Sequence, residues 1–176
     1  MKIQEDKIKE YSGTTFNVVK TNGVSKITFN DSNWIENKEY YGEVFLGDCV
    51  DCGKIKELYK DFTFDKILIL GLGLGLLPNY AKHVKKCSVV DVVDNNSELI
   101  SYVDYLDDSI GLIEADVLDY TPTKKYDLII VDLWWNESDV TEEIQTEIDN
   151  IYNDHLNIGG KIIFPLISKQ INKKWE

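Results

Sequence analysis

The feature that most constrains the fold of this chain is an apolar run that ends in closely spaced glycines. Residues 67–70 are Ile-Leu-Ile-Leu, and residues 71–75 read Gly-Leu-Gly-Leu-Gly. A short run that is apolar at every position is typical of a strand buried on both faces in a parallel sheet. Glycine lets the backbone after such a strand turn tightly and approach a ligand closely. Gly71, Gly73 and Gly75 are therefore predicted to bind a ligand.

From residue 66 onward, predicted strands alternate with predicted helices. Further strands are expected over 88–93, 112–113, 128–131 and 161–167. Helices are expected near Pro78, after a cap formed by Ser97, and over about 141–155, with Gly159-Gly160 ending that last helical unit. Such alternation implies a parallel sheet with right-handed crossovers. We therefore predict an α/β fold, a Rossmann-like parallel sheet flanked by helices and shortened at its C-terminus.

A different pattern precedes this unit. Apolar and polar residues alternate over 16–18 and 27–29, on either side of Asn22-Gly23. Asn-Gly tolerates the positive φ angles of a type I′ turn, so this segment predicts a β-hairpin. A further strand is expected over 40–46.

The change of pattern predicts a division of the chain into two parts. Residues 1–52 are expected to form an N-terminal β region that serves oligomerisation or covers the substrate. Residues 53–176 are expected to form the Rossmann-like nucleotide-binding domain. A homo-oligomer formed through the β region is a plausible assembly on this interpretation.

Aspartates stand where three of the predicted strands end. Asp94 ends the second strand of the unit that begins at residue 66, and an acid there can accept hydrogen bonds from both hydroxyls of a ribose. Asp116 follows the third strand, in position to bond an adenine amino group, and Asp132 ends the fourth. Ligands of open α/β sheets bind outside the carboxyl ends of the strands, so glycines and acids should converge there. The alternative is that each acid only caps the turn that follows it.

The spacing of the glycines separates the candidate ligands. Dinucleotide-binding folds carry G-x-G-x-x-G, in which the third glycine packs helix on strand while the helix N-terminus holds a pyrophosphate. Here Leu76 stands where that spacing requires glycine. The tighter G-x-G-x-G form resembles the loop of class I methyltransferases, whose ligand carries no phosphate. NAD and FAD are therefore disfavoured.

The charge of the chain bears on its partners. With 31 acidic and 19 basic residues the formal net charge is −12. An acidic surface repels phosphate backbones, so we expect no nucleic-acid partner. Small cationic or zwitterionic partners such as amines suit this field better.

Cysteine content and hydropathy bear on location. The chain has three cysteines and an N-terminus without an apolar segment, which indicates a reducing, cytoplasmic environment. Cys49 and Cys52 form a lone C-x-x-C, and the only histidines are His83 and His155, so we expect no metal site. No run of about eighteen apolar residues exists, so we expect no membrane partner.

Over residues 66–133 the sequence resembles the spermidine synthase-like branch of the class I S-adenosylmethionine-dependent methyltransferase superfamily. Residues 67–75 are similar to that family's strand and G-G-G-D-G loop, 93–100 to its V-E-I-D-P-E-V-I segment, and 126–132 to its Y-D-V-I-I-x-D strand. The resemblance implies that Asp94 takes the place of the ribose-binding glutamate. It also implies that Asp132 lies beside the reacting amine.

The sequence departs from that family at three acceptor-side positions. Leu74 stands where the family has the loop aspartate, and Trp135 stands where its D-x-x-D pairing has the second acid. Gly42 stands where the family has a histidine before the glutamate of its N-terminal motif, here Glu43. The resemblance therefore implies a nucleotide site that is kept and a polyamine site that is altered.

These features give one leading hypothesis and three alternatives. The leading hypothesis is a methyltransferase that acts on a small molecule, uses S-adenosylmethionine and no metal, and has Asp132 as its base or amine-orienting residue, with Glu43 second. Trp134-Trp135 either lines the pocket, where a ring face attracts a cation, or forms a lid or subunit contact. The alternatives are an aminopropyltransferase that uses decarboxylated S-adenosylmethionine, a non-catalytic or repurposed domain, and breakdown of S-adenosylmethionine without an acceptor.

Overall fold

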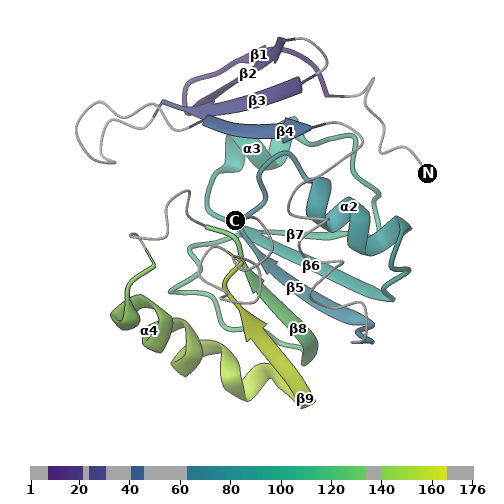
Figure 1. Ribbon diagram of the computed structural model, residues 1–176, viewed down its shortest axis with the longest axis vertical. Helices are drawn as coiled ribbons and strands as arrows, with labels where there is room; N and C mark the ends of the chain where they lie inside the picture. The colour runs from purple at the N-terminus through teal and green to yellow at the C-terminus, as the bar shows by residue number, and fades with distance from the viewer. Residues whose placement is uncertain (1–7, 22–23, 31–40, 46–62, 134–139, 166–176) are drawn as a thin grey trace, which may run out of the picture.

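The computed structural model describes residues 8–21, 24–30, 41–45, 63–133 and 140–165. Its elements, in chain order, are β1 (Tyr11–Ser12), β2 (Phe16–Thr21), β3 (Val24–Phe29), β4 (Tyr41–Phe45), β5 (Lys66–Leu70), α2 (Leu76–His83), β6 (Val89–Asp94), α3 (Ser97–Tyr102), β7 (Gly111–Glu114), β8 (Tyr126–Val131), α4 (Glu142–Tyr152), the 3₁₀ turn η2 (Asn153–His155) and β9 (Leu156–Ile163). Figure 1 shows an N-terminal sheet lying over a second sheet that is flanked by helices.

The second sheet has five parallel strands in the order β7-β6-β5-β8-β9. Helices connect β5 to β6, β6 to β7 and β8 to β9, whereas residues 115–125 join β7 to β8 without a helix. The order reverses beside β5, the strand that leads into the glycine loop. The prediction of a Rossmann-like parallel sheet flanked by helices is confirmed.

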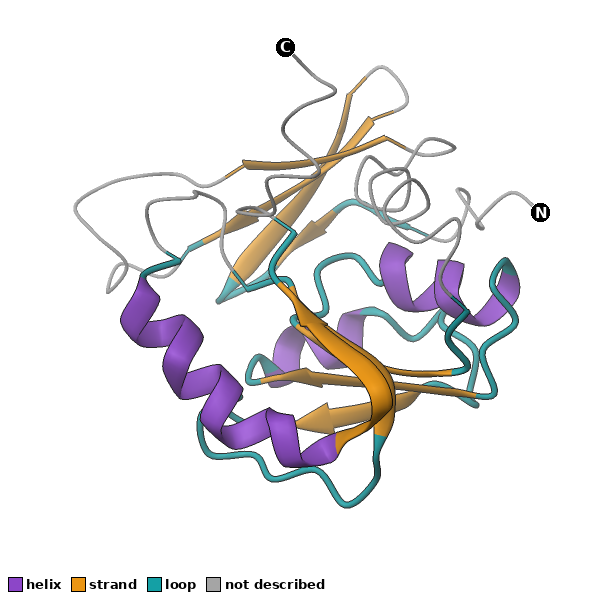
Figure 2. Ribbon diagram, turned by 60° about the horizontal axis from the view of Figure 1, so that its bottom comes forward, coloured by secondary structure: helices purple, strands orange, loops and turns teal. Residues whose placement is uncertain are grey.

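Alternate residues of the central strands face two separate cores. Ile67 and Ile69 of β5 belong to a core with the apolar residues of α2 and α3, whereas Leu68 and Leu70 pack with Ile148 and the rest of the buried face of α4. This is the period of two expected for a strand. Figure 2 shows α4 apart from the two shorter helices, with the strands between them.

The N-terminal sheet is antiparallel, in the order β1-β2-β3-β4. Thr21 pairs with Val24 at the end of the β2–β3 ladder, so the predicted hairpin has the two-residue loop expected for Asn22-Gly23. The loop itself lies outside the described residues. The strand predicted over 40–46 is β4, which pairs with β3.

The N-terminal sheet and the parallel-sheet unit share one core. Ile8, Phe16, Val18 and Ile27 are buried in the same cluster as Leu99 of α3. In Figure 1 the N-terminal sheet lies over α3, in agreement with this cluster. One face of the N-terminal sheet is therefore covered by the chain's own α/β unit. The proposed boundary between residues 52 and 53 lies outside the described residues and stays a prediction.

Two predicted element boundaries are wrong. The last strand begins at Leu156, ends at Ile163 and contains Gly159 and Gly160 instead of following them. Gly159 has a φ of 81°, and a Cβ on Gly160 would lie 2.9 Å from the carbonyl oxygen of Tyr126. The glycines therefore form a bulge against β8, where the register shifts, and do not break the strand.

The cap of α3 is Asn96, and Ser97 is the first residue of the helix. Asn96 has extended backbone angles, and its Oδ1 accepts a hydrogen bond from the Leu99 N–H at 3.0 Å. These are the properties of an N-cap. The helix predicted over about 141–155 is α4, capped by Thr141 and continued by η2.

Several predictions fall on residues outside the described ranges. These are the Cys49/Cys52 pair and the Trp134-Trp135 pair. Across the ranges that are described, no helix has the length and apolarity to cross a membrane. The same ranges contain no group of three or more side chains arranged to hold a metal ion.

Candidate functional site

Backbone hydrogen bonds at and beside Gly71 join the carboxyl ends of three neighbouring strands. The Gly71 N–H donates to the carbonyl of Val93 in β6 at 2.8 Å, and the N–H of Asp132, after β8, donates to the carbonyl of Leu70 in β5 at 2.8 Å. Gly71 has a φ of 104°, and a Cβ there would lie 2.1 Å from the carbonyl oxygen of Asp132. This close approach, at a φ that side chains rarely adopt, requires glycine. It brings the start of the loop next to Asp132.

The other two glycines have different surroundings. Gly75 is the N-cap of α2 with a φ of 70°, and a Cβ on it would meet the side chain of Leu106 at 2.9 Å. Gly73 has a φ of 52°, and a Cβ on it would have no atom of the described residues within 4 Å. Gly71 and Gly75 are thus explained by packing within the protein. Gly73 is the glycine of this loop that faces open space.

Asp94 is the last residue of β6, and both oxygens of its half-buried carboxylate face backbone donors. Oδ2 accepts from the N–H of Leu72 in the glycine loop, and Oδ1 accepts from the N–H of Asn96, each at 2.9 Å. Burial raises the pKa of Asp94, although both hydrogen bonds oppose that shift. Each carboxylate oxygen has a second lone pair. Asp94 can therefore accept two further hydrogen bonds while it holds the loop.

Asp116 and Asp132 lie close to Asp94 along the same end of the sheet. The strand before Asp116 ends at Glu114, and the N–H of Ala115 donates to the carbonyl of Asp94 at 3.1 Å. Asp116 is exposed, and its Oδ1 accepts from the N–H of Leu118 at 2.9 Å. It therefore caps its own turn, and its second oxygen is the atom left for a ligand. Asp132 is half-buried and follows β8 directly.

Leu74 occupies the loop position at which the resembled family has an acid. Its side chain is 3% exposed and belongs to the core between the sheet and α2. Its carbonyl accepts a hydrogen bond from the Tyr105 hydroxyl at 2.8 Å. The loop therefore turns this side chain into the protein, and an unpaired carboxylate at this position would be buried at a large cost.

Sequence reasoning missed a second cluster beside Asp94, centred on Glu98. The Glu98 carboxylate accepts hydrogen bonds from Tyr11 of β1 and from Thr14 and Thr15 in the turn between β1 and β2. An acid in the first turn of a helix already suits the helix dipole, so nothing local indicated another role. The donors are more than eighty positions away in the sequence, and no spacing rule reaches that far.

The acids at the amino end of the parallel sheet have structural partners. Asp127 accepts from the N–H groups of Asp65 and Lys66 at 2.9 Å and from Asn157 at 2.7 Å. Burial alone would raise the pKa of Asp127, but these hydrogen bonds outweigh it and lower the pKa. Asp127 therefore has a structural role at this end of the sheet.

Asp91, in the middle of β6, has polar partners within the protein. Its buried carboxylate accepts from the Tyr126 hydroxyl and from the Lys124 ammonium, both at 2.8 Å. The group is satisfied within the protein and faces away from the carboxyl end of the sheet.

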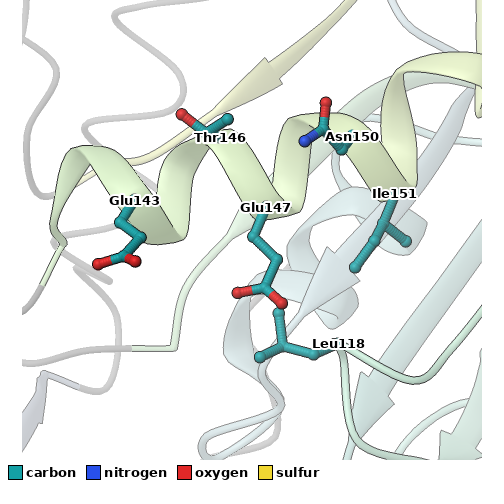
Figure 3. A pocket seen from close by; sticks show the side chains of 6 residues that line it. All are labelled: Leu118, Glu143, Thr146, Glu147, Asn150 and Ile151. Atoms are coloured by element: carbon teal, nitrogen blue, oxygen red, sulfur yellow. The ribbon is translucent and has the colours of Figure 1, made fainter.

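A shallow depression contains none of the predicted site residues, although the backbone N–H of one of its lining residues, Leu118, donates to Asp116. The depression has a volume of about 760 Å³ and lies along α4, beside the loop after β7 (Figure 3). Its lining residues are Leu118, Glu143, Thr146, Glu147, Asn150 and Ile151. The glycine loop and Asp94 are therefore the candidate site, and this depression is not part of it.

Comparison with known proteins adds evidence on the fold. No family model matches the sequence, and no curated protein matches it. Among solved structures, the plantazolicin methyltransferase BpumL, in complex with a triazolic desmethylPZN analog and SAH, matches with a TM-score of 0.53 and 18% identity. That match covers 65% of this chain and 45% of BpumL.

Two further structures match in the same way. An S-adenosylmethionine-dependent methyltransferase from Clostridium acetobutylicum ATCC 824 has a TM-score of 0.52 and 24% identity, over 64% of this chain and 48% of that one. The glycopeptide N-methyltransferase MtfA has a TM-score of 0.51 and 14% identity, over 65% and 52%. This chain matches only about half the length of these proteins. The likeness shows that its parallel-sheet unit has the class I methyltransferase fold.

Proposed function

We propose that this chain binds S-adenosylmethionine at the glycine loop and transfers its methyl group to a small molecule. The observation that carries the proposal is the placement of Asp94. It lies at the end of the strand next to β5, it is tied to the loop through Leu72, and it keeps one lone pair on each oxygen. Two acceptors at this place suit the two hydroxyls of a ribose.

The residues around Asp94 fit a nucleoside ligand without phosphate. Gly73 leaves open space where a side chain would stand, so the ligand can approach the backbone of the loop. Asp116 lies next to Asp94 along the sheet end and has one carboxylate oxygen beyond its turn. We propose that Asp94 binds the ribose and that Asp116 binds the adenine amino group.

Asp132 is the proposed catalytic residue. S-adenosylmethionine supplies an electrophilic methyl group on a positively charged sulfur. The contribution of the protein is to align the acceptor and to receive or orient its proton. Asp132 is fixed beside Gly71 through its backbone, and its half-buried carboxylate follows β8 at the same sheet end as Asp94. A carboxylate there would orient an amine acceptor, and the net charge of −12 favours such a cation.

The aminopropyl alternative has less support. It requires the decarboxylated ligand and, by the resemblance, an acid in the glycine loop. Leu74 stands at that position with its side chain in the core. The spermidine synthase-like assignment therefore rests on the sequence resemblance alone, and we propose methyl transfer in preference to it.

Calorimetric titration of the full chain tests the proposal. The ligands are S-adenosylmethionine, its decarboxylated form and 5′-methylthioadenosine. We expect the first to bind best. In Asp94→Ala its affinity should fall at least tenfold, since hydrogen bonds to a charged group contribute about 1.5–3 kcal/mol.

Asp108→Ala is the matched control. Asp108 is exposed and lies before β7, at the amino end of the sheet, so its loss should leave the affinity unchanged. Preference for the decarboxylated ligand would favour aminopropyl transfer. Absence of binding to all three ligands would refute the proposed function and favour a non-catalytic domain.

A further inference from the structure

The turn between β1 and β2 surrounds the carboxylate of Glu98 with hydrogen-bond donors. The Tyr11 hydroxyl and the Thr14 N–H reach Oε1, each at 2.8 Å. The Thr15 N–H reaches Oε2 at 2.8 Å, together with the hydroxyls of Thr14 at 2.8 Å and Thr15 at 2.6 Å. A carboxylate has about four lone-pair directions, so all of them are engaged by this turn.

The turn is shaped for this contact. A Cβ on Gly13 would lie 2.0 Å from Oε1 of Glu98, so a side chain at position 13 would displace the carboxylate. The hydrogen bonds from Thr15, Thr14 and Tyr11 outweigh partial burial and lower the pKa of Glu98 to about 2. The turn therefore favours the ionised form of Glu98.

The same turn reaches Asp94 through one intermediate residue. The hydroxyl of Thr15 lies 3.1 Å from Oδ1 of Asn96, so its single proton is shared between Asn96 and Glu98. The backbone N–H of Asn96 in turn donates to Oδ1 of Asp94 at 2.9 Å. Thr15, Asn96 and Asp94 thus form a continuous chain of contacts from the N-terminal sheet to the ribose-binding acid.

A second connection reaches the glycine loop. The ring of Tyr102 contacts Tyr11 and Phe16 of the N-terminal sheet at centroid distances of 5.1 and 5.5 Å, and it meets Tyr105 edge-on at 6.0 Å. The Tyr105 hydroxyl donates to the carbonyl of Leu74 at 2.8 Å. The N-terminal sheet is therefore connected through intermediate residues to both segments that supply the candidate site.

We propose that Glu98 and Thr15 are positioning residues for the nucleoside, which hold the β1–β2 turn against α3 and thereby fix the carboxylate of Asp94 for the ribose hydroxyls. The inference rests on the proposed function, because it takes Asp94 as the ribose acceptor. It gives the N-terminal sheet a role in ligand selectivity in addition to its role in the core.

The test measures preference for a ribose. S-adenosylhomocysteine and its 2′-deoxy analogue are titrated into wild-type protein and into Glu98→Gln, Thr15→Val and Thr15→Ser. Wild-type protein should prefer the ribose form about tenfold or more. Glu98→Gln and Thr15→Val should reduce that preference at least threefold through weaker binding of the ribose form, with affinity for the deoxy form within twofold. Thr15→Ser restores the hydroxyl and should restore the preference.

Glu147→Gln, an exposed substitution of the same kind on α4, should leave the preference unchanged. A merely structural role for Glu98 would lower the thermal stability and weaken both ligands equally, and that result would overturn the proposal. Amide chemical shifts of Leu72 and Asn96 in ligand-free protein test the connection separately. If Glu98→Gln changes these chemical shifts but wild-type protein binds no ligand, the nucleoside site is refuted and the connection is retained. If the chemical shifts are the same in Glu98→Gln as in wild-type protein, the connection is refuted.

Discussion

The two ends of the parallel sheet both carry aspartates, but they use them differently. At the amino end, Asp127 takes hydrogen bonds from three donors and Asp65 takes two from Ser88, and both pKa values are lowered. At the carboxyl end, Asp94 takes two, and burial raises its pKa. At the amino end the hydrogen bonds outweigh burial and favour the ionised carboxylates, so these contacts stabilise the fold. A half-buried acid with lone pairs left over is available to a ligand.

The largest effect is expected within the carboxyl end itself, at its glycines. Gly71→Ala should destabilise the protein by about 3 kcal/mol or more, because its Cβ would overlap the carbonyl of Asp132 at an unfavourable φ. Gly73→Ala should cost about 1 kcal/mol of left-handed strain and should weaken nucleoside binding. Chemical denaturation and titration of both variants measure these effects. Equal destabilisation would contradict the distinction between a packing glycine and a ligand-facing glycine.

The next largest effect is a loss of stability at the amino end of the sheet, without the loss of affinity expected at the carboxyl end. Asp127→Ala leaves the N–H groups of Asp65 and Lys66 and the amide of Asn157 without their acceptor, so it should destabilise the fold by about 2 kcal/mol. The ligand affinity of the folded protein should not change. Asp108→Ala, at the same end of the sheet, should alter stability by less than about 0.5 kcal/mol. A loss of affinity in Asp127→Ala comparable to that in Asp94→Ala would break the comparison.

The smallest effect is expected in the pH dependence. The pKa shifts of the aspartates have opposite directions at the two ends of the sheet. The lowered pKa values of Asp65 and Asp127 give stability that is present above about pH 4 and lost as pH falls through their folded-state values. Asp94, with its raised pKa, takes up a proton at a higher pH in the folded state than in the unfolded chain. Nucleoside affinity should therefore fall on acidification before stability does. Titrations and denaturation curves between pH 3 and 7 check the order, and a simultaneous loss would contradict it.

The central fold could be predicted from the sequence because its signals are local. The apolar run over 67–70, the glycines after it and the aspartate at the end of β6 each follow from residue type and spacing. The bulge at Gly159 could not be predicted, since glycine in a strand and glycine after a helix give the same local signal. The contact between Glu98 and Thr15 depends on how two distant segments pack. Spacing therefore predicts which residues occupy the sheet end, and packing determines how they are held.

The tie between Tyr11 and Glu98 also has a consequence for the order of folding. It joins residues 87 positions apart, and contacts of such long sequence separation form slowly because a long loop must close first. At ribosomal rates of about 5–20 residues per second, roughly four to seventeen seconds separate the synthesis of these two residues. The N-terminal strands therefore emerge before α3. Until α3 packs against them, their apolar face is uncovered and is a candidate surface for chaperones. Strands that are made before α3 would thus be among the last segments to reach their native contacts.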